Sequence, residues 1–181
     1  MATQVVVLDA CALYGIEVTD LVLTMATQHL FRPHWSPQIL HEVTRNLKLR
    51  DDLDPEAIDR RIGYMNRALP SALDEAPATL IDAMPVNEKD RHVLALAVHV
   101  EAPRIVTENL RDFPAEHLER FDVDAVSVDA FVLDHIERDP AAVVGAIDAM
   151  AARRRRHPKT PEDIIEVLRR QLARSMATLA T

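Results

Sequence analysis

The stretch Val5-Val6-Val7-Leu8-Asp9 decides the fold class, because four apolar residues run without interruption into a carboxylate. An apolar run of this length is typical of a strand that is buried on both faces inside a parallel sheet, and we expect it to be the central strand. An acid at the end of such a strand lies in the crevice at the carboxyl edge of the sheet, where open α/β folds bind their ligands. Asp9 could equally begin a turn or cap the next helix, since Asp favours both positions.

Two further segments, residues 103–107 and 124–128, are short and rich in β-branched residues, which predicts two more strands. Helical patterns separate all three predicted strands, so the order of elements is βαβ and the sheet is parallel with right-handed crossovers. We therefore predict an α/β fold with a central parallel sheet. A chain of 181 residues with 48% hydrophobic residues suffices for one domain and a tail.

Composition excludes several classes of protein. There are 3 Gly against 11 Pro, and neither a GxGxxG nor a P-loop pattern occurs, which argues against the classical nucleotide folds. The single cysteine, Cys11, rules out an internal disulfide and a cysteine-based zinc cage, as is usual in a reducing cytoplasm. We see no signal peptide and no apolar run of membrane-spanning length, so we expect a soluble, cytoplasmic protein without a membrane partner.

A second candidate acid, Glu42, lies on a predicted helix that begins at Ser36-Pro37, with Ser as the N-cap and Pro at the first helical position. At about 100° per residue, Glu42 and Asn46 lie together along one flank of the apolar stripe of this helix, so Glu42 can reach the edge of the core. The alternative is an ordinary surface pair between Glu42 and Arg45.

A third acid, Asp90, lies near the middle of the apolar face of the helix that opens at Asn87. A carboxylate at such a position must be hydrogen-bonded, paired with a cation, or made neutral by a raised pKa. The alternative is local, because Asp90 could exchange capping hydrogen bonds with Asn87.

Asn109 and Asp112 follow the second predicted strand, at the sheet edge where Asp9 ends the first. The helices that carry Glu42 and Asp90 can face the same crevice. A cluster of carboxylate and amide oxygens without a His and Cys set suits Mg²⁺ or Mn²⁺ rather than zinc. The pattern therefore predicts metal-assisted phosphoester chemistry.

Four motifs in this order resemble the PIN-domain ribonucleases, and among them the VapC-type toxins of bacterial toxin–antitoxin pairs. The matching stretches are Val7 to Cys11, Trp35 to Leu47, Asp90 to Ala95 and Val106 to Pro114. The resemblance implies a PIN-like three-layer α/β/α domain over residues 1–133 and a helical C-terminal extension over residues 134–181, as in a longer VapC subgroup.

The same resemblance implies the site. Asp9, Glu42 and Asp90 would be the acidic, catalytic ligands of Mg²⁺ or Mn²⁺, with Thr107, Asn109 and Asn46 in support. Many family members carry an acid soon after the Thr, where this chain has Asn109. Either Asn109 or Asp112 could be the fourth ligand, and we favour Asp112.

The resemblance also implies partners. These would be a tRNA, rRNA or mRNA substrate whose cleavage stops translation and growth, a cognate antitoxin protein, and a second copy in a homodimer. Residues 1–150 carry 13 Lys and Arg against 26 Asp and Glu, a net charge of −13 that would suit an antitoxin with basic side chains.

The C-terminal extension is basic, with 8 Lys and Arg against 3 Asp and Glu over residues 151–181. We predict two amphipathic helices in it, one opening at Asp139-Pro140 and one running from Thr160-Pro161 through Met176. The run of Arg153, Arg154, Arg155 and Arg156 could contact RNA, could pair with the acidic body of the same chain, or could complement a helix dipole.

Two other functions are compatible with these residues. One is a different Mg²⁺-dependent phosphohydrolase, such as a haloacid-dehalogenase-like phosphatase, although Cys11 stands where that family carries a second Asp. The other is a non-catalytic PIN-like scaffold that binds RNA or protein, against which the retention of four acids argues.

Overall fold

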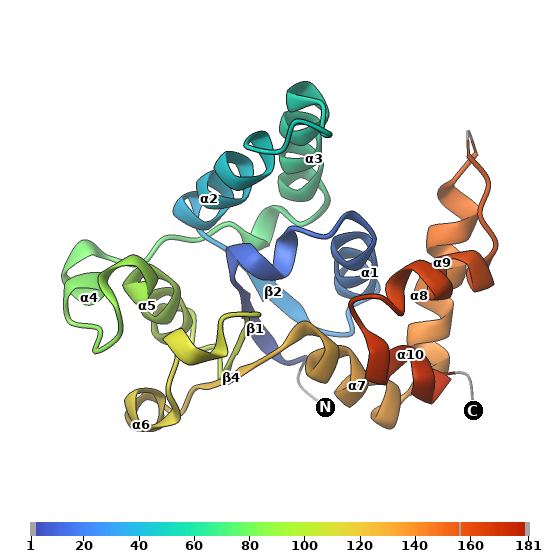
Figure 1. The fold of residues 1–181 in the computed structure, drawn as a ribbon. Coiled ribbons are helices and arrows are strands. Elements are labelled where there is room, and N and C mark those ends of the chain that lie inside the picture. The colour runs from blue at the N-terminus through green and yellow to red at the C-terminus, as the bar shows by residue number, and fades with distance from the viewer. Residues whose placement is uncertain (1–2, 156, 180–181) are drawn as a thin grey trace.

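The fold was analysed in a computed structural model, which describes residues 3–155 and 157–179. Within these residues, one parallel sheet of four strands has the order β2-β1-β3-β4 (Figure 1). The strands are β1 (Val5–Leu8), β2 (Arg32–His34), β3 (Arg104–Val106) and β4 (Asp124–Val126). Val6, Val7 and Leu8 are fully buried, which confirms that the first apolar run is an interior strand.

Helices cover both faces of the sheet, with α5 against β1 and β3 on one side and α1 and α7 on the other, while α8 packs outside against α1 and α7 (Figure 1). The α-helices are α1 (Ile16–Thr27), α2 (Pro37–Lys48), α3 (Pro55–Ala68), α4 (Ala78–Asp82), α5 (Arg91–His99), α6 (Ala115–Leu118), α7 (Val128–Arg138), α8 (Pro140–Arg153), α9 (Pro161–Leu168) and α10 (Ala173–Leu179). Short 3₁₀ helices are η1 (Ala10–Leu13), η2 (Pro70–Ala72), η3 (Glu88–Asp90), η4 (Leu110–Asp112) and η5 (Glu119–Phe121). The predicted α/β class, with a parallel sheet and C-terminal helices, is confirmed.

Strand β2 was not expected from the sequence. It has only three residues, two of them polar and one a proline, and it carries no apolar run. Because β2 is an edge strand that pairs with β1 alone, Pro33 leaves no ladder hydrogen bond unmade on a second side. Pairing with β1, rather than an apolar pattern of its own, therefore makes this segment a strand.

Several helices begin where the sequence predicts them. The Ser36 side chain accepts a hydrogen bond from the Ile39 backbone N–H at 3.1 Å, and Pro37 is the first residue of α2. At α9, Thr160 and Asp163 form a complete capping box. These caps satisfy backbone donors that a helix start otherwise leaves open.

The predicted single helix from Thr160 through Met176 is wrong, because the chain forms two helices there, α9 and α10. The Asp129 carboxylate of α7 accepts hydrogen bonds from the backbone N–H groups of Arg174 and Ser175, at 3.1 and 2.9 Å. It thereby caps α10 from another part of the chain and turns α10 onto α7.

The predicted domain boundary, between residues 133 and 134, falls inside α7. Helix α7 packs against both α8 and α10. The division into residues 1–133 and 134–181 stays a prediction. Across the described residues, no helix combines the length and the apolar character needed to cross a membrane.

Candidate metal centre at the carboxyl edge of the sheet

Asp9 directly follows the central strand and is 6% exposed. One carboxylate oxygen, Oδ1, accepts a hydrogen bond from the Ala10 backbone N–H at 2.7 Å, so Asp9 caps η1 as one interpretation of the sequence allowed. The other oxygen, Oδ2, accepts hydrogen bonds from Thr107 Oγ1 at 2.7 Å and from Cys11 Sγ at 3.1 Å. Capping and a place at the sheet edge therefore coexist, and the Asp9 carboxylate is held in one orientation.

Thr107, at the end of β3, is fully buried and connects the two central strands through this contact. Its hydroxyl oxygen accepts a hydrogen bond from the Asn109 backbone N–H at 3.0 Å. The Cys11 thiol lies 3.2 Å from Thr107 Oγ1 and accepts a hydrogen bond from the Glu108 backbone N–H. Burial raises the pKa of Cys11 to about 11, so the thiol stays protonated and can donate to Asp9. Thr107 and Cys11 are positioning groups for that carboxylate.

Asp90 ends η3 and is 9% exposed, as its place on an apolar helix face predicts. Asn87 makes no side-chain capping hydrogen bond with it; only the Asp90 backbone N–H bonds to the Asn87 carbonyl. Among the described residues, Asp90 Oδ2 is buried and makes no hydrogen bond. Burial, and then the charges of Asp112 and Asp9, raise the pKa of Asp90, while Lys89 opposes this. Asp9, Asp90 and Asp112 therefore share one electrostatic environment.

Asp112 ends η4 and reaches η3 through Lys89. The Lys89 Nζ atom is 2.8 Å from Asp112 Oδ2 and 3.6 Å from Asp90 Oδ2. Asn109 contributes its backbone N–H to Thr107, and its side chain is exposed. Asp112 and Asn109 are both on the same loop, so the identity of the fourth ligand stays a prediction.

Glu42 does not pair with Arg45 as the alternative interpretation allowed. Its Oε1 atom lies 3.0 Å from Nε2 of His92, which is 3% exposed on α5. The two atoms are within ion-pair distance, but neither ring nitrogen of His92 makes a hydrogen bond to any described residue. This contact places Glu42 beside His92 of α5, which follows Asp90 by two residues in the sequence.

Asn46 lies one turn after Glu42 and donates a short hydrogen bond from its amide to the Tyr14 hydroxyl. Burial, and more weakly the charges of Asp9 and Glu42, raise the pKa of Tyr14. Helix α2 packs against η1, the helical turn that follows Asp9. The flank of α2 that carries Glu42 and Asn46 is therefore directed at the same edge as Asp9.

The donor set fits a hard divalent cation better than zinc, since it consists of carboxylates and includes a buried Asp90 oxygen without a hydrogen bond. As placed, no three His, Cys, Asp or Glu side chains of the described residues lie close enough together to hold an ion. The predicted ligands are therefore neighbours at one edge, but not an assembled coordination shell.

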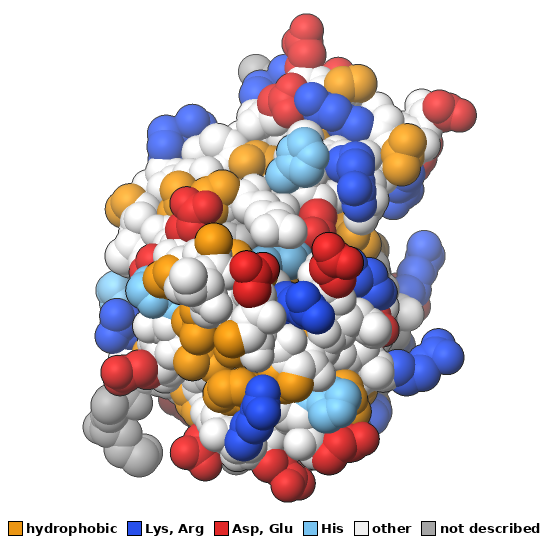
Figure 2. All heavy atoms as spheres, turned by 90° about the vertical axis from the view of Figure 1, so that its left-hand side faces the viewer, with side chains coloured by type: hydrophobic (Ala, Val, Ile, Leu, Met, Phe, Trp, Pro, Cys, Tyr) orange, Lys and Arg blue, Asp and Glu red, His pale blue; other side chains and the backbone are white. Residues whose placement is uncertain are grey.

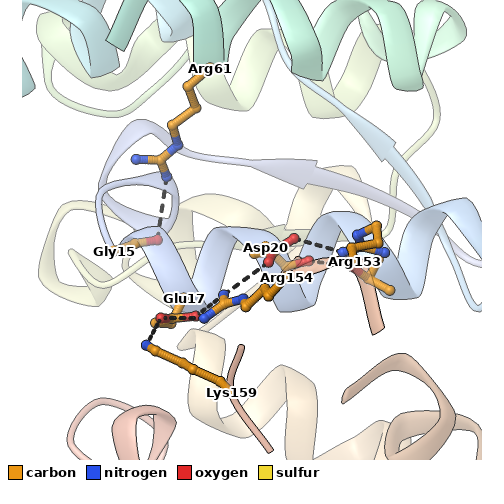
Figure 3. Close-up of polar contacts among 8 residues, drawn as sticks. Gly15, Glu17, Asp20, Arg61, Arg153, Arg154 and Lys159 are labelled. Carbon is orange, nitrogen blue, oxygen red and sulfur yellow. Dashed lines mark hydrogen bonds and ion pairs between the residues drawn. The ribbon is translucent and has the colours of Figure 1, made fainter. Parts of the chain in front are cut away.

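The arginine run mainly contacts the body of the same chain, as one of the three interpretations predicted (Figure 3). Arg154 forms ion pairs with Glu17 and Asp20 of α1, and Arg153 Nη2 lies 2.9 Å from Asp20 Oδ1. Lys159 Nζ adds a second contact to Glu17 at 2.8 Å. The Arg155 side chain is exposed, and Arg156 lies outside the described residues.

Sequence reasoning missed three partners of the site, namely Lys89, His92 and Tyr14. Lys89 precedes a core-facing acid, and the need of that acid for a cation could have indicated it. His92 is buried on α5, two residues after Asp90, but no local pattern indicates that it meets Glu42. Tyr14 carries no local signal, because its partner Asn46 is 32 residues away.

The parallel α/β sheet, its acidic carboxyl edge and the C-terminal helices define an α/β protein of the kind that the motifs predicted, consistent with a PIN-like fold. Residues 128–181 match the family described as "VapC50 C-terminal domain". The chain is also 38% identical, over 97 residues, to the "Putative ribonuclease VapC50" of Mycobacterium tuberculosis (strain ATCC 25618 / H37Rv).

That alignment covers 51% of this chain and 55% of the relative, so it spans about half the length of each. No solved structure matches the chain. The two matches confirm the resemblance to VapC-type proteins that carry a C-terminal extension.

Proposed function

We propose that this chain is a metal-dependent endoribonuclease, the toxin of a toxin–antitoxin pair, which hydrolyses RNA phosphodiester bonds and so inhibits translation and growth. The observation that carries the proposal is the buried Asp9 carboxylate, oriented by Thr107 and Cys11 at the sheet edge that also carries Asp90 and Asp112. The name of the mycobacterial relative supports RNA as the substrate.

Asp9, Glu42, Asp90 and Asp112 would hold Mg²⁺ or Mn²⁺, which when bound activates water and neutralises charge on the scissile phosphate. The chain itself supplies orientation. Thr107 and Cys11 fix the Asp9 carboxylate, and groups that orient a metal ligand in this way commonly change metal affinity or activity 10-fold to 100-fold when removed. The His92 ring on α5 lies beside the Glu42 carboxylate.

The proposed partners are an RNA, a cognate antitoxin and a second copy of the chain, and the proposed compartment is the cytoplasm. The acidic charge of residues 1–150 supports an antitoxin that presents basic side chains. The face over α4, α5 and α6 carries acidic and basic side chains side by side (Figure 2), so we do not place the RNA there on charge alone. We also propose the division into a nuclease domain, residues 1–133, and an extension, residues 134–181.

The test is cleavage of a labelled RNA mixture by the purified chain with Mg²⁺ or Mn²⁺, and with EDTA. We expect metal-dependent cutting that Asp9→Asn and Asp90→Asn each reduce by at least about 100-fold, because each removes a charged ligand. Asp59→Asn is the matched control, since Asp59 is an exposed carboxylate on α3 paired with Lys48.

Cutting that persists in EDTA or in both Asn variants would refute the proposal. If no RNA is cut with either ion, while RNA still binds, the scaffold interpretation replaces it. A phosphatase of the haloacid-dehalogenase type would instead release phosphate from small phosphoesters. Cys11 lies in the place of that enzyme's general acid, and its raised pKa keeps the thiol protonated, but it is hydrogen-bonded inward to Asp9.

A further inference from the structure

Lys89 places a cation at the acidic carboxyl edge of the sheet. Its Nζ atom donates to Asp112 Oδ2 at 2.8 Å and lies 3.6 Å from Asp90 Oδ2. Asp90 belongs to η3, which precedes α5, and Asp112 belongs to η4, which follows β3. The ammonium group therefore bridges two of the acids that the proposed function assigns to a divalent ion.

The energetic need for a cation at this place is clear from Asp90. Its Oδ2 atom is buried and makes no hydrogen bond within the described residues, so Lys89 is the nearest charge that compensates it. A buried carboxylate next to other carboxylates is costly unless a cation is close. Asp9 and Asp112 both add negative charge to the surroundings of Asp90.

Lys89 is also able to leave. Its side chain is 65% exposed, whereas those of Asp90 and Asp112 are 12% and 23% exposed. An exposed ammonium on a flexible stem makes ion pairs that are individually weak in water, so a divalent cation can displace it. Among the described residues, the ion pairs of the Lys89 side chain are those with Asp90 and Asp112.

We propose that Lys89 is the internal counter-ion of this acidic edge: it bridges Asp90 and Asp112 in the metal-free protein and competes with the divalent cation for both carboxylates. This inference rests on the proposed function, because it takes the two acids to be metal ligands. It makes Lys89 a positioning residue that sets the metal affinity of the site, not a ligand of the ion.

The experiment is a Mn²⁺ titration of the RNA-free protein, followed by electron paramagnetic resonance of the free ion. In Lys89→Met, we expect Mn²⁺ to bind about threefold to tenfold more tightly than in the wild type, as expected when two weak competing ion pairs are removed. Lys89→Arg keeps the charge and should stay close to the wild type. Lys48→Met is the matched control, because Lys48 makes a similar 2.8 Å ion pair with Asp59 elsewhere.

A second measurement needs no RNA cleavage either. Without metal, the thermal unfolding midpoint of Lys89→Met should lie about 2–4 °C below that of the wild type. Saturating Mn²⁺ should raise the midpoint of Lys89→Met by more than it raises that of the wild type. Lys89→Gln, which keeps a polar side chain, should show the same changes if Met disturbs folding.

The outcomes separate this inference from the proposed function. If the wild type binds Mn²⁺, and Asp90→Asn does not, but Lys89→Met and Lys89→Gln bind it with wild-type affinity, Lys89 is not a competitor and only this inference is overturned. Weaker Mn²⁺ binding in both variants would overturn it as well. If neither the wild type nor any variant binds Mn²⁺, the proposed metal centre and this inference both fail.

Discussion

Removing the Thr107 hydroxyl tests how strongly one buried side chain controls the stability and the metal affinity of the site. Thr107 is fully buried and its hydroxyl donates to Asp9 Oδ2 at 2.7 Å. Thr107→Val keeps the shape and removes the donor, so we expect the free energy of unfolding to fall by about 1.5–3 kcal/mol, the range for a hydrogen bond to a charged group. We also expect Mn²⁺ affinity to fall about 10-fold to 100-fold, because the carboxylate loses its orientation. Urea unfolding and a Mn²⁺ titration measure the two effects.

Thr107→Ser is the control for this prediction, since it keeps the hydroxyl and loses only a methyl group. Its Mn²⁺ affinity should remain near the wild-type value. If Val and Ser variants bind Mn²⁺ equally well, the hydrogen bond to Asp9 stabilises the fold but does not orient a metal ligand.

At the scale of elements, α7 carries a buried histidine, His135, beside Phe31, the residue before β2. The His135 ring lies 4.8 Å from that of Phe131 and 5.7 Å from that of Phe31, measured between ring centroids. Burial lowers the pKa of His135 to about 4, against about 6.5 in an unfolded chain. The folded state therefore favours the neutral ring.

The sign of the pH dependence follows from that shift. Above about pH 6.5 both states bind no proton at His135, and the stabilisation is fully present. As the pH falls toward 4, the unfolded state takes up the proton first, and up to about 3 kcal/mol is lost. Urea unfolding at pH 7.5 and pH 5 should show a smaller difference in His135→Phe than in the wild type. The exposed His41→Gln should keep the wild-type difference, and an equal difference in all three proteins would contradict the assignment.

The elements also show where sequence reasoning succeeds and fails. An apolar run fixes β1, and Ser36 and Thr160 fix two helix starts, because the cause of each lies within a few residues. Strand β2 and the break before α10 depend on partners far away in the sequence, β1 and Asp129. The four acids could be proposed from their places after strands and on helix faces, and their role as metal ligands stays a prediction. Lys89, His92 and Tyr14 are joined to them by side-chain contacts that no periodicity encodes.

At the scale of the whole molecule, Arg153 and Arg154 attach the C-terminal extension to α1. The side chains of Glu17 and Arg154 are only 14% and 19% exposed, and the pKa of Glu17 is lowered chiefly by its hydrogen bonds from Arg154. Asp129 holds α10 from the other side through Ser175. Two separate groups of polar contacts thus fix the extension, in which Ile164 and Leu168 of α9 are fully buried.

Replacing Arg153 and Arg154 together by Gln should loosen this attachment. We expect faster amide hydrogen exchange in α9 and in the first turns of α1, since the charge-assisted bonds to Glu17 and Asp20 are lost. Arg155→Gln removes an equally basic but exposed side chain and should leave the exchange unchanged.

RNA affinity measured between low and high salt distinguishes the rival role, in which the arginines contact RNA. If the double variant exchanges like the wild type but loses RNA affinity and lowers the salt dependence of binding, these arginines contact phosphates and the attachment to α1 is secondary. If exchange rises while the salt dependence stays the same, Arg153 and Arg154 stabilise the fold and do not contact RNA phosphates.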